Sequence, residues 1–197
     1  MLLRAVNVGG RGLSSELWRE ALATLGLPAR TMGSTGNAVV EAGPGVRAGH
    51  LEKLVEDALV RTGGPATDAF ARDGREWDRI VRGNPFPREA VHDPAHLLVT
   101  ALKSSPERAA WSELRGSISG RERVAPGERC AYVVYPDGIG RSKLTAALLE
   151  RKLGVRGTGR NWNTVLQLQA LLQVSLPDAG GARIEPVAGR GVSESWR

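Results

Sequence analysis

The clearest signal for the fold of the first half of the chain lies in Arg30-Thr31-Met32-Gly33-Ser34-Thr35-Gly36-Asn37-Ala38-Val39-Val40-Glu41. Its two ends are short segments of strand-like composition, and between them lie five residues rich in glycine and polar side chains. This pattern predicts two strands, Arg30–Met32 and Ala38–Glu41, joined by a loop. The segments on either side of the two strands then define the topology.

Four further segments surround this pair of strands. Leu2–Val8 is apolar and is followed by two glycines, which predicts a strand, and Ser14 or Ser15 caps a helix that reaches about Leu25. Residues 48–61 have apolar side chains at helical spacing, and residues 67–71 are a candidate strand. The resulting order, β-α-β-β-α-β, is that of the ferredoxin-like split unit.

The second half repeats part of this order: strand, helix, two strands, helix. A short helix and a proline-containing loop precede the repeat. The predicted elements are a helix at Trp77–Val81, a loop at Asn84–Pro87, a strand at His96–Leu102, a helix at Pro106–Leu114, a hairpin of Glu122–Val124 and Arg129–Tyr135, and helices at Ser142–Leu153 and Asn161–Leu172.

The predicted fold class is therefore α+β, with two linked ferredoxin-like (split β-α-β) subdomains and mainly antiparallel sheets. Residues 1–75 form the first subdomain, and residues 76–175 form the second, which carries the basic motifs described below. Residues 176–197 are rich in glycine and proline and predict a loosely ordered tail, with at most a short strand near Arg183–Pro186.

Composition excludes several classes of protein. The 197 residues are 41% hydrophobic and 24% charged, as in an ordinary globular protein. No apolar run approaches the roughly 18 residues of a membrane span, and Met1–Val8 is too short for a secretory signal, so we expect a cytoplasmic protein with no membrane partner. Cys130 is the single cysteine, and His92 and His96 straddle Pro94, so we expect no disulfide, metal site or cofactor.

The positive charge is concentrated in one segment. The formal net charge is +6, and residues 141–160 contain six basic side chains and one acidic side chain, which is +5 of that total. A cluster of this kind is more informative than overall basicity, because placement decides whether cations act together.

The first motif in this region is Tyr135 to Thr145, a strand followed by a glycine-bearing turn and a helix start. Backbone N–H groups at such a junction attract anions, and the side chains add charged donors. The spacing is not that of a Walker A loop. The alternative is a tight turn with a capping serine and solvated cations. The candidate anion ligands are Gly138, Gly140, Arg141, Ser142 and Lys143.

The second motif is Gly157 to Val165, a second glycine-bearing turn that places hydrogen-bonding residues around Trp162 at a helix start. Asn161 or Thr158 is a candidate helix cap, and Arg160 and Asn163 are candidate ligand contacts. An exposed Trp162 would stack on a base while Arg160 met a phosphate, whereas a buried Trp162 would only pack; packing is the favoured interpretation.

A third set of polar residues supports these motifs. Asn7 interrupts an apolar strand, and a buried asparagine needs hydrogen-bond partners. We expect it to tie down the loop that contains Gly36 and Asn37. The result is either the wall of a site or a purely structural polar cluster.

The chain resembles the bacterial protein family known as DUF1697, a domain of unknown function, over roughly residues 2–172. Two departures are Arg4-Ala5-Val6-Asn7, where the family has Arg-Gly-Ile-Asn, and Thr35-Gly36-Asn37, where it has Ser-Gly-Asn. The resemblance implies an α+β fold of two ferredoxin-like subdomains and supplies no activity. It rests on Arg4–Gly10, Thr31–Val40, Asn84-Pro85-Phe86, Tyr135–Leu144 and Gly157–Val165, and most of all on Gly140–Leu144 and Arg160–Thr164.

Two functions fit these residues. No nucleophile elbow and no catalytic cysteine signature is present, and Asp137 is the only acid in the motif regions. The first hypothesis is a binding module for nucleic acid or another phosphate polyanion. The alternative is a small-molecule enzyme or sensor that holds a nucleotide or phosphorylated metabolite at the same loops, clamped by Arg141, Lys143 and Arg160.

Overall fold

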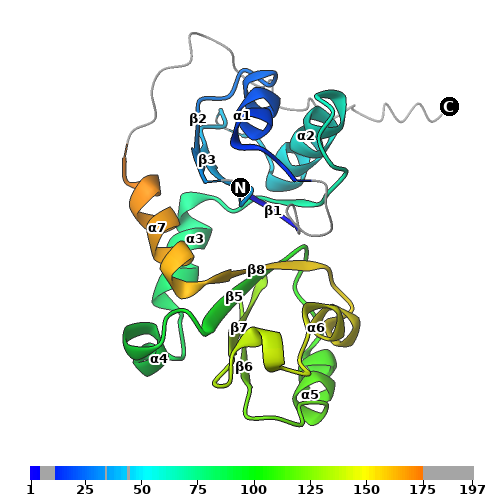
Figure 1. Ribbon diagram of the computed structural model, residues 1–197, viewed down its shortest axis with the longest axis vertical. Helices are drawn as coiled ribbons and strands as arrows, with labels where there is room; N and C mark the ends of the chain where they lie inside the picture. The colour runs from blue at the N-terminus through cyan, green and yellow to red at the C-terminus, as the bar shows by residue number, and fades with distance from the viewer. Residues whose placement is uncertain (5–11, 34, 44, 175–197) are drawn as a thin grey trace, which may run out of the picture.

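The computed structural model describes residues 1–4, 12–33, 35–43 and 45–174, which form an α+β protein with two four-stranded antiparallel sheets (Figure 1). Along the chain the elements are β1 (Leu2–Leu3), α1 (Ser15–Ala23), β2 (Ala29–Met32), β3 (Asn37–Val40), α2 (Ala48–Arg61), β4 (Ala69–Phe70), α3 (Gly74–Arg82), α4 (Pro87–His92), β5 (Leu97–Leu102), α5 (Arg108–Gly116), β6 (Arg123–Gly127), β7 (Cys130–Val134), the 3₁₀ turn η1 (Ile139–Arg141), α6 (Ala146–Leu153), β8 (Gly157–Asn161) and α7 (Trp162–Leu172).

Both sheets have the same arrangement. The first sheet has the order β2-β3-β1-β4, and the second has the corresponding order β6-β7-β5-β8. Helices α1 and α2 cover the outer face of the first sheet, where Trp18 and Leu59 are fully buried. Helices α5 and α6 cover the outer face of the second, where Leu114 and Leu149 are buried.

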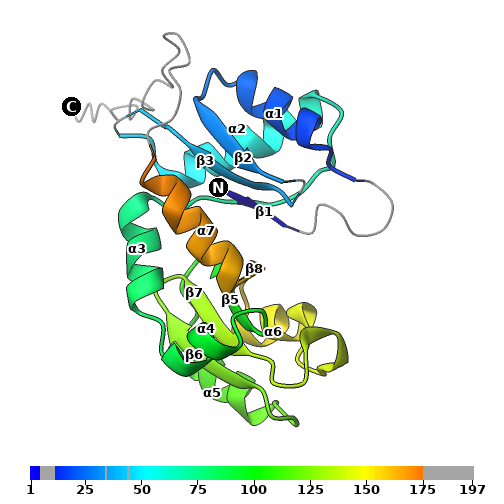
Figure 2. The same ribbon diagram turned by 60° about the vertical axis from the view of Figure 1, so that its left-hand side comes forward.

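Helices α3 and α7 lie between the two sheets in both views (Figures 1 and 2). The inner faces of the sheets and these helices share one buried cluster, which includes Phe70, Trp77, Tyr132 and Leu168. The indole N–H of Trp77 donates a hydrogen bond of 3.2 Å to the carbonyl of Val165, which joins α3 to α7. The two halves therefore share a hydrophobic core.

Most predicted elements are confirmed, with corrections at their ends. Helix α3 begins at Gly74 because Asp73 and Glu76 form a capping box. Pro87 begins helix α4 at a position predicted to be loop, as a proline in the first turn can. Helix α5 begins at Arg108, two residues after the predicted start, and β6 continues to Gly127 in place of the predicted longer loop.

Two predictions about the basic region are wrong. The helix predicted from Ser142 begins at Ala146, where Thr145 caps it. The residues Gly157–Asn161, predicted to be a glycine-bearing turn, form the edge strand β8, which pairs with β5 from Leu102↔Gly157 to Leu98↔Asn161. Because these residues form a strand, the second half of the chain has the same order of strands and helices around its sheet as the first half.

Predictions for several segments fall outside the described residues. The strand predicted at Leu2–Val8 is observed at Leu2–Leu3, and the part of this prediction from residue 5 onward lies outside the described residues. The short strand near Arg183–Pro186 also lies outside. No helix in the described ranges is long and apolar enough to cross a membrane.

Candidate functional site

The turn between β7 and α6 carries the first predicted motif. Gly138 has a φ of 83°, a conformation that favours glycine, and its N–H donates to the carbonyl of Tyr135 at 2.9 Å. A side chain added at Gly140 would meet nothing within 4 Å. The turn therefore requires glycine at position 138 and leaves open space around position 140.

Two cations on this turn are available to solvent. Arg141 and Lys143 are exposed, and neither forms an ion pair with any residue that the structure describes. Asp137 is engaged by Arg121, whose hydrogen bonds hold the pKa of that carboxyl below its usual range. The hydroxyl of Ser142 donates to Glu122 and is thus engaged as well.

The helix start differs from the predicted anion site. Helix α6 begins three residues after Lys143, and the hydroxyl of Thr145 accepts the N–H of Leu148 at 3.2 Å. The N–H of Leu144 donates to the Oγ of Ser142 at 2.9 Å. Several of the N–H groups that would face an anion are consequently used within the turn. Any anion binding here depends mainly on side-chain charge.

Arg160 lies in β8 and reaches across to the first sheet. Its Nε donates to the Oδ1 of Asn37 at 2.6 Å, and one Nη atom donates to the carbonyls of Leu3 at 2.8 Å and Thr35 at 3.2 Å. The other Nη donates to Thr158 and to the carbonyl of Gly159, both at 2.8 Å. Burial lowers the pKa of Arg160 to about 10, so the guanidinium remains charged at neutral pH.

Asn37 and its loop complete this contact. Asn37 is 1% exposed, and its Nδ2 donates to the Oγ1 of Thr35 at 2.7 Å. The carbonyl of Gly36 accepts the N–H of Leu3 at 2.8 Å, and Gly36 has a φ of 68°. The structure thus brings Arg160, Gly36 and Asn37 together as a junction between the halves. The predicted role of Asn7 lies outside the described residues.

The remaining residues of the second motif shape the start of α7. The Oδ1 of Asn161 accepts the N–H of Thr164 at 3.0 Å, so Asn161 is the helix cap. Trp162 is 4% exposed and belongs to the shared core, which leaves no free ring face for a base. Asn163 is exposed on the first turn of α7.

The two predicted motifs flank one loop. The N–H of Tyr135 donates to the carbonyl of His96 at 2.9 Å, and the N–H of Trp162 donates to the carbonyl of Pro94 at 3.1 Å. The backbones of both motifs are therefore close to residues 93–96. Their charged groups are not brought together, because the Nε and one Nη of Arg160 donate to the first half and the other Nη donates within β8.

A second polar junction was missed by the sequence analysis. Glu52 in α2 is 6% exposed, and its Oε2 accepts a bond of 2.8 Å from the Nζ of Lys103, just after β5. Its Oε1 accepts the N–H of Ala71 at 2.8 Å. Arg129, in the β6–β7 turn, pairs with Glu76 at 3.0 Å. These residues are far apart in sequence, so only folding reveals the cluster.

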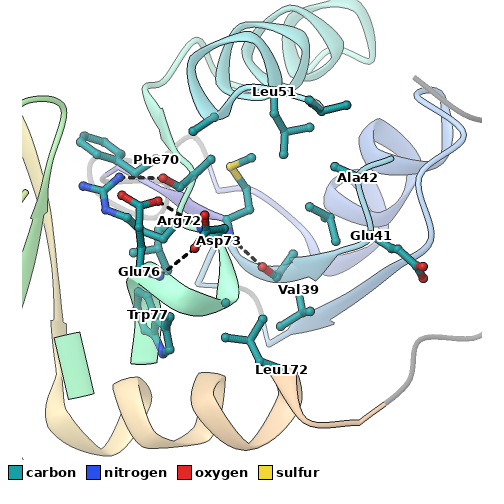
Figure 3. Close-up of a pocket in the computed structure, with 18 of the residues that line it drawn as sticks. Val39, Glu41, Ala42, Leu51, Phe70, Arg72, Asp73, Glu76, Trp77 and Leu172 are labelled. Carbon is teal, nitrogen blue, oxygen red and sulfur yellow. Dashed lines mark hydrogen bonds between the residues drawn. The ribbon is translucent and has the colours of Figure 1, made fainter. Parts of the chain in front are cut away.

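A cavity of about 370 Å³ was also missed (Figure 3). Val39 and Ala42 line one side, Arg72 lines the opposite side, and Leu51 and Leu172 lie above and below in this view. A volume in this range is typical of small-ligand sites. The apolar residues show only ordinary core patterns in the sequence, so no local signal marks them as lining residues.

No group of three or more His, Cys, Asp or Glu side chains in the described part of the chain is close enough to hold a metal ion. Burial raises the pKa of Cys130 to about 11, so its thiol is neutral near pH 7 and is a poor nucleophile.

Comparison with protein families gives one match. Residues 1–132 match the model of a family described as "Protein of unknown function (DUF1697)". The match ends before both basic motifs. No curated protein and no solved structure matches the chain.

Proposed function

Because the chain belongs to the DUF1697 family, whose function is unknown, we propose its function from its own surface: it is a binding module for nucleic acid or another phosphate polyanion. The contact residues are Arg141, Lys143 and Arg151. We call these three residues the free cations.

One observation carries this proposal. All three free cations are exposed, and none has an ion-pair partner among the described residues. The basic segment also contains Lys152, which is half-buried, Arg156, which pairs with Asp68 at 2.8 Å, and Arg160, which is used inside the protein. The free cations are thus the part of the segment whose charge is left for a ligand.

Their spacing suits an extended ligand. Helix α6 has eight residues and a length of about 12 Å, so Arg151 lies at the opposite end from the turn that holds Arg141 and Lys143. An extended row of cations matches a row of phosphates better than it matches one phosphate group. Exposed cations displace condensed counterions from such a chain, which produces salt-dependent binding.

The nucleotide-binding alternative needs a more compact arrangement. It requires Arg160 and Asn163 to face one ligand together with Lys143 and Asn37. Arg160 instead donates five hydrogen bonds to protein groups, and Asn37 accepts one of them. No polar cluster in the described residues replaces that clamp, so the polyanion proposal has the stronger support.

The proposal includes an architecture of two ferredoxin-like subdomains. Its support is the order β-α-β-β-α-β in each half and the placement of the first strand of each half between the third and fourth. The free cations then lie on the second subdomain, on the elements that follow the β6–β7 hairpin.

The experiment is fluorescence polarisation with labelled 20-nucleotide single-stranded and duplex RNA and DNA across a salt series. We expect log K to fall linearly with log salt concentration. In the double variant Arg141→Gln/Lys143→Gln the slope should decrease in magnitude by about 2, because two phosphate contacts are lost.

A matched control removes two exposed cations from the first half. Arg47 and Arg61 lie at the two ends of α2 and are also exposed, so Arg47→Gln/Arg61→Gln changes the net charge by the same amount. Its salt slope should equal that of the unaltered protein. Absence of salt-sensitive binding at low ionic strength, or an equal loss in the control, would overturn the proposal.

A further inference from the structure

We propose that the cavity beside β3 is a docking site for an extended peptide of a partner protein, which would bind as an added strand and carry apolar side chains and a basic residue. This site is separate from the free cations and does not depend on the polyanion proposal. Three features of the cavity support it: an unpaired backbone edge, an apolar lining and an acidic rim.

The backbone of β3 has an unpaired section next to the cavity. The N–H of Ala38 donates to the carbonyl of Met1 at 3.0 Å, whereas the N–H of Glu41 donates to the carbonyl of Pro28, on β2's side, at 2.9 Å. Backbone groups alternate in direction along a strand, so those of Val40 face the same way as those of Ala38. In the β2–β3 register the backbone groups of Val39 and Glu41 face β2, so those of Val40 are directed away from β2 and toward the cavity.

The facing side of the cavity shows the same alternation. The N–H of Ala71 donates to Glu52, away from β1, so the backbone groups of Arg72 are directed toward the cavity. In the sheet order, β1 lies between β3 and β4, which places the two flanking chains about 10 Å apart, or two strand spacings. That gap admits one strand. Val40 and Arg72 would each contribute backbone hydrogen bonds to it.

Apolar side chains lie on both faces of this gap (Figure 3). Leu51 of α2 lies on one face, and Trp77 of α3 and Leu172 of α7 lie on the other. Successive side chains of a strand point to opposite faces, so both faces of the bound peptide would meet apolar surface. The cavity of about 370 Å³ has room for about three residues, if each occupies roughly the volume of a valine.

Charge at the rim favours a cationic peptide. Glu41 and Asp73 line the cavity and are exposed, and neither forms an ion pair with a described residue. The Nη atoms of Arg72 are directed away, to the carbonyls of Ala71, Leu102 and Arg129. The accessible rim is therefore acidic. A lysine or arginine beside the apolar positions of the peptide would complement it.

The test uses a capped hexapeptide with a lysine at each end and valines between them, titrated into the full chain and followed by NMR-detected hydrogen exchange. We expect saturable binding and slower exchange of the Val40 amide. The Val39 amide is the internal control, because it already faces Arg30 of β2 in the sheet and should change little. Binding that leaves Val40 unprotected would overturn the proposal.

Two variants separate this site from general hydrophobic binding. Ala42→Trp fills the half-buried lining and should weaken peptide binding by about tenfold or more, equivalent to about 1.4 kcal/mol. Val60→Trp adds the same ring to an exposed position of α2, where Val60 is 57% exposed, and should leave binding unchanged. Equal affinity of both variants would refute the site.

A charge variant tests the stated chemistry of the partner. Glu41→Lys should weaken the lysine-flanked peptide about two- to fivefold, as expected for an exposed ion pair, and should not weaken an otherwise identical serine-flanked peptide. Glu20→Lys, on an exposed position of α1, is the control. An equal effect on both peptides would contradict the basic preference. Nucleic-acid binding should be unchanged in every variant of this site, so the two proposals can fail separately.

Discussion

The Nε of Arg160 in β8 lies 2.6 Å from the Oδ1 of Asn37 in β3, and this hydrogen bond joins the sheet of one half to the sheet of the other. The carbonyls of Leu3 and Thr35 accept further bonds from the same guanidinium. An arginine in the most basic segment of the chain therefore connects the two halves, and its charge is largely hidden from solvent.

Replacing this arginine should destabilise the junction. In Arg160→Met, Asn37 and the carbonyl of Leu3 lose a donor at a partly buried junction, and we expect the free energy of unfolding to fall by about 2–4 kcal/mol. Urea denaturation measures the change. The control Arg156→Met removes an arginine that is 63% exposed and should cost less than about 1 kcal/mol. Equal losses would show that Arg160 has no special structural role.

The Lys103–Glu52 pair should behave as a buried ion pair. Lys103→Met removes the nearer cation of the Glu52 carboxylate, which is 6% exposed, and leaves only the Arg129 guanidinium at 4.0 Å, so we expect a loss of about 3 kcal/mol. In the Lys103→Met variant, Glu52→Gln should lower the free energy of unfolding by less than it does in the unaltered protein, and a double-mutant cycle measures this coupling. Lys53→Met is the control, because Lys53 and Asp57 form an exposed pair. Additive losses at Lys103 and Glu52 would contradict the prediction.

Glycine is required at position 157 because β8 lies close to β5. A Cβ there would lie 2.8 Å from the Cγ2 of Thr100 and 2.9 Å from the Cδ2 of Leu102. Gly157→Ala should lower the free energy of unfolding by about 1–3 kcal/mol, as overpacking does. Gly140→Ala meets no neighbour within 4 Å and should change stability by less than about 0.5 kcal/mol. Thermal and urea unfolding of both variants provide the comparison.

Alkaline pH should destabilise the protein. Burial raises the pKa of Cys130 from 9.0 to about 11 and that of Tyr135 from 10.0 to about 12, so the unfolded chain releases these protons first. The native state then holds more protons, and the free energy of unfolding falls as pH rises above about 9, by at most about 1.4 kcal/mol per pH unit for each group. Urea unfolding at several pH values measures the slope.

The variant Cys130→Ala distinguishes the contribution of the thiol to this pH dependence from that of Tyr135. The variant should lose stability more slowly between pH 9 and about 11 than the unaltered protein, although its stability at pH 7 is lower because a buried side chain has been shortened. Parallel pH profiles would show that the thiol does not contribute.

Elements with local signals could be predicted from the amino-acid sequence. Apolar side chains at helical spacing predicted α2, a run of buried strand residues predicted β5, and Asn161 marked the start of α7. The sequence also located the basic segment and the family. These predictions succeeded because caps, turns and periodic burial act over a few residues.

Three other features became apparent only in the folded protein. The glycines of residues 157–161 indicated a turn, and only pairing with β5 makes this segment a strand. The charge of Arg160 indicated a ligand contact, whereas its position opposite Asn37 directs its donors into the protein. The cavity beside Val40 depends on how three strands and three helices meet. Each of these features joins residues far apart in the chain, and composition and spacing carry no information about such contacts.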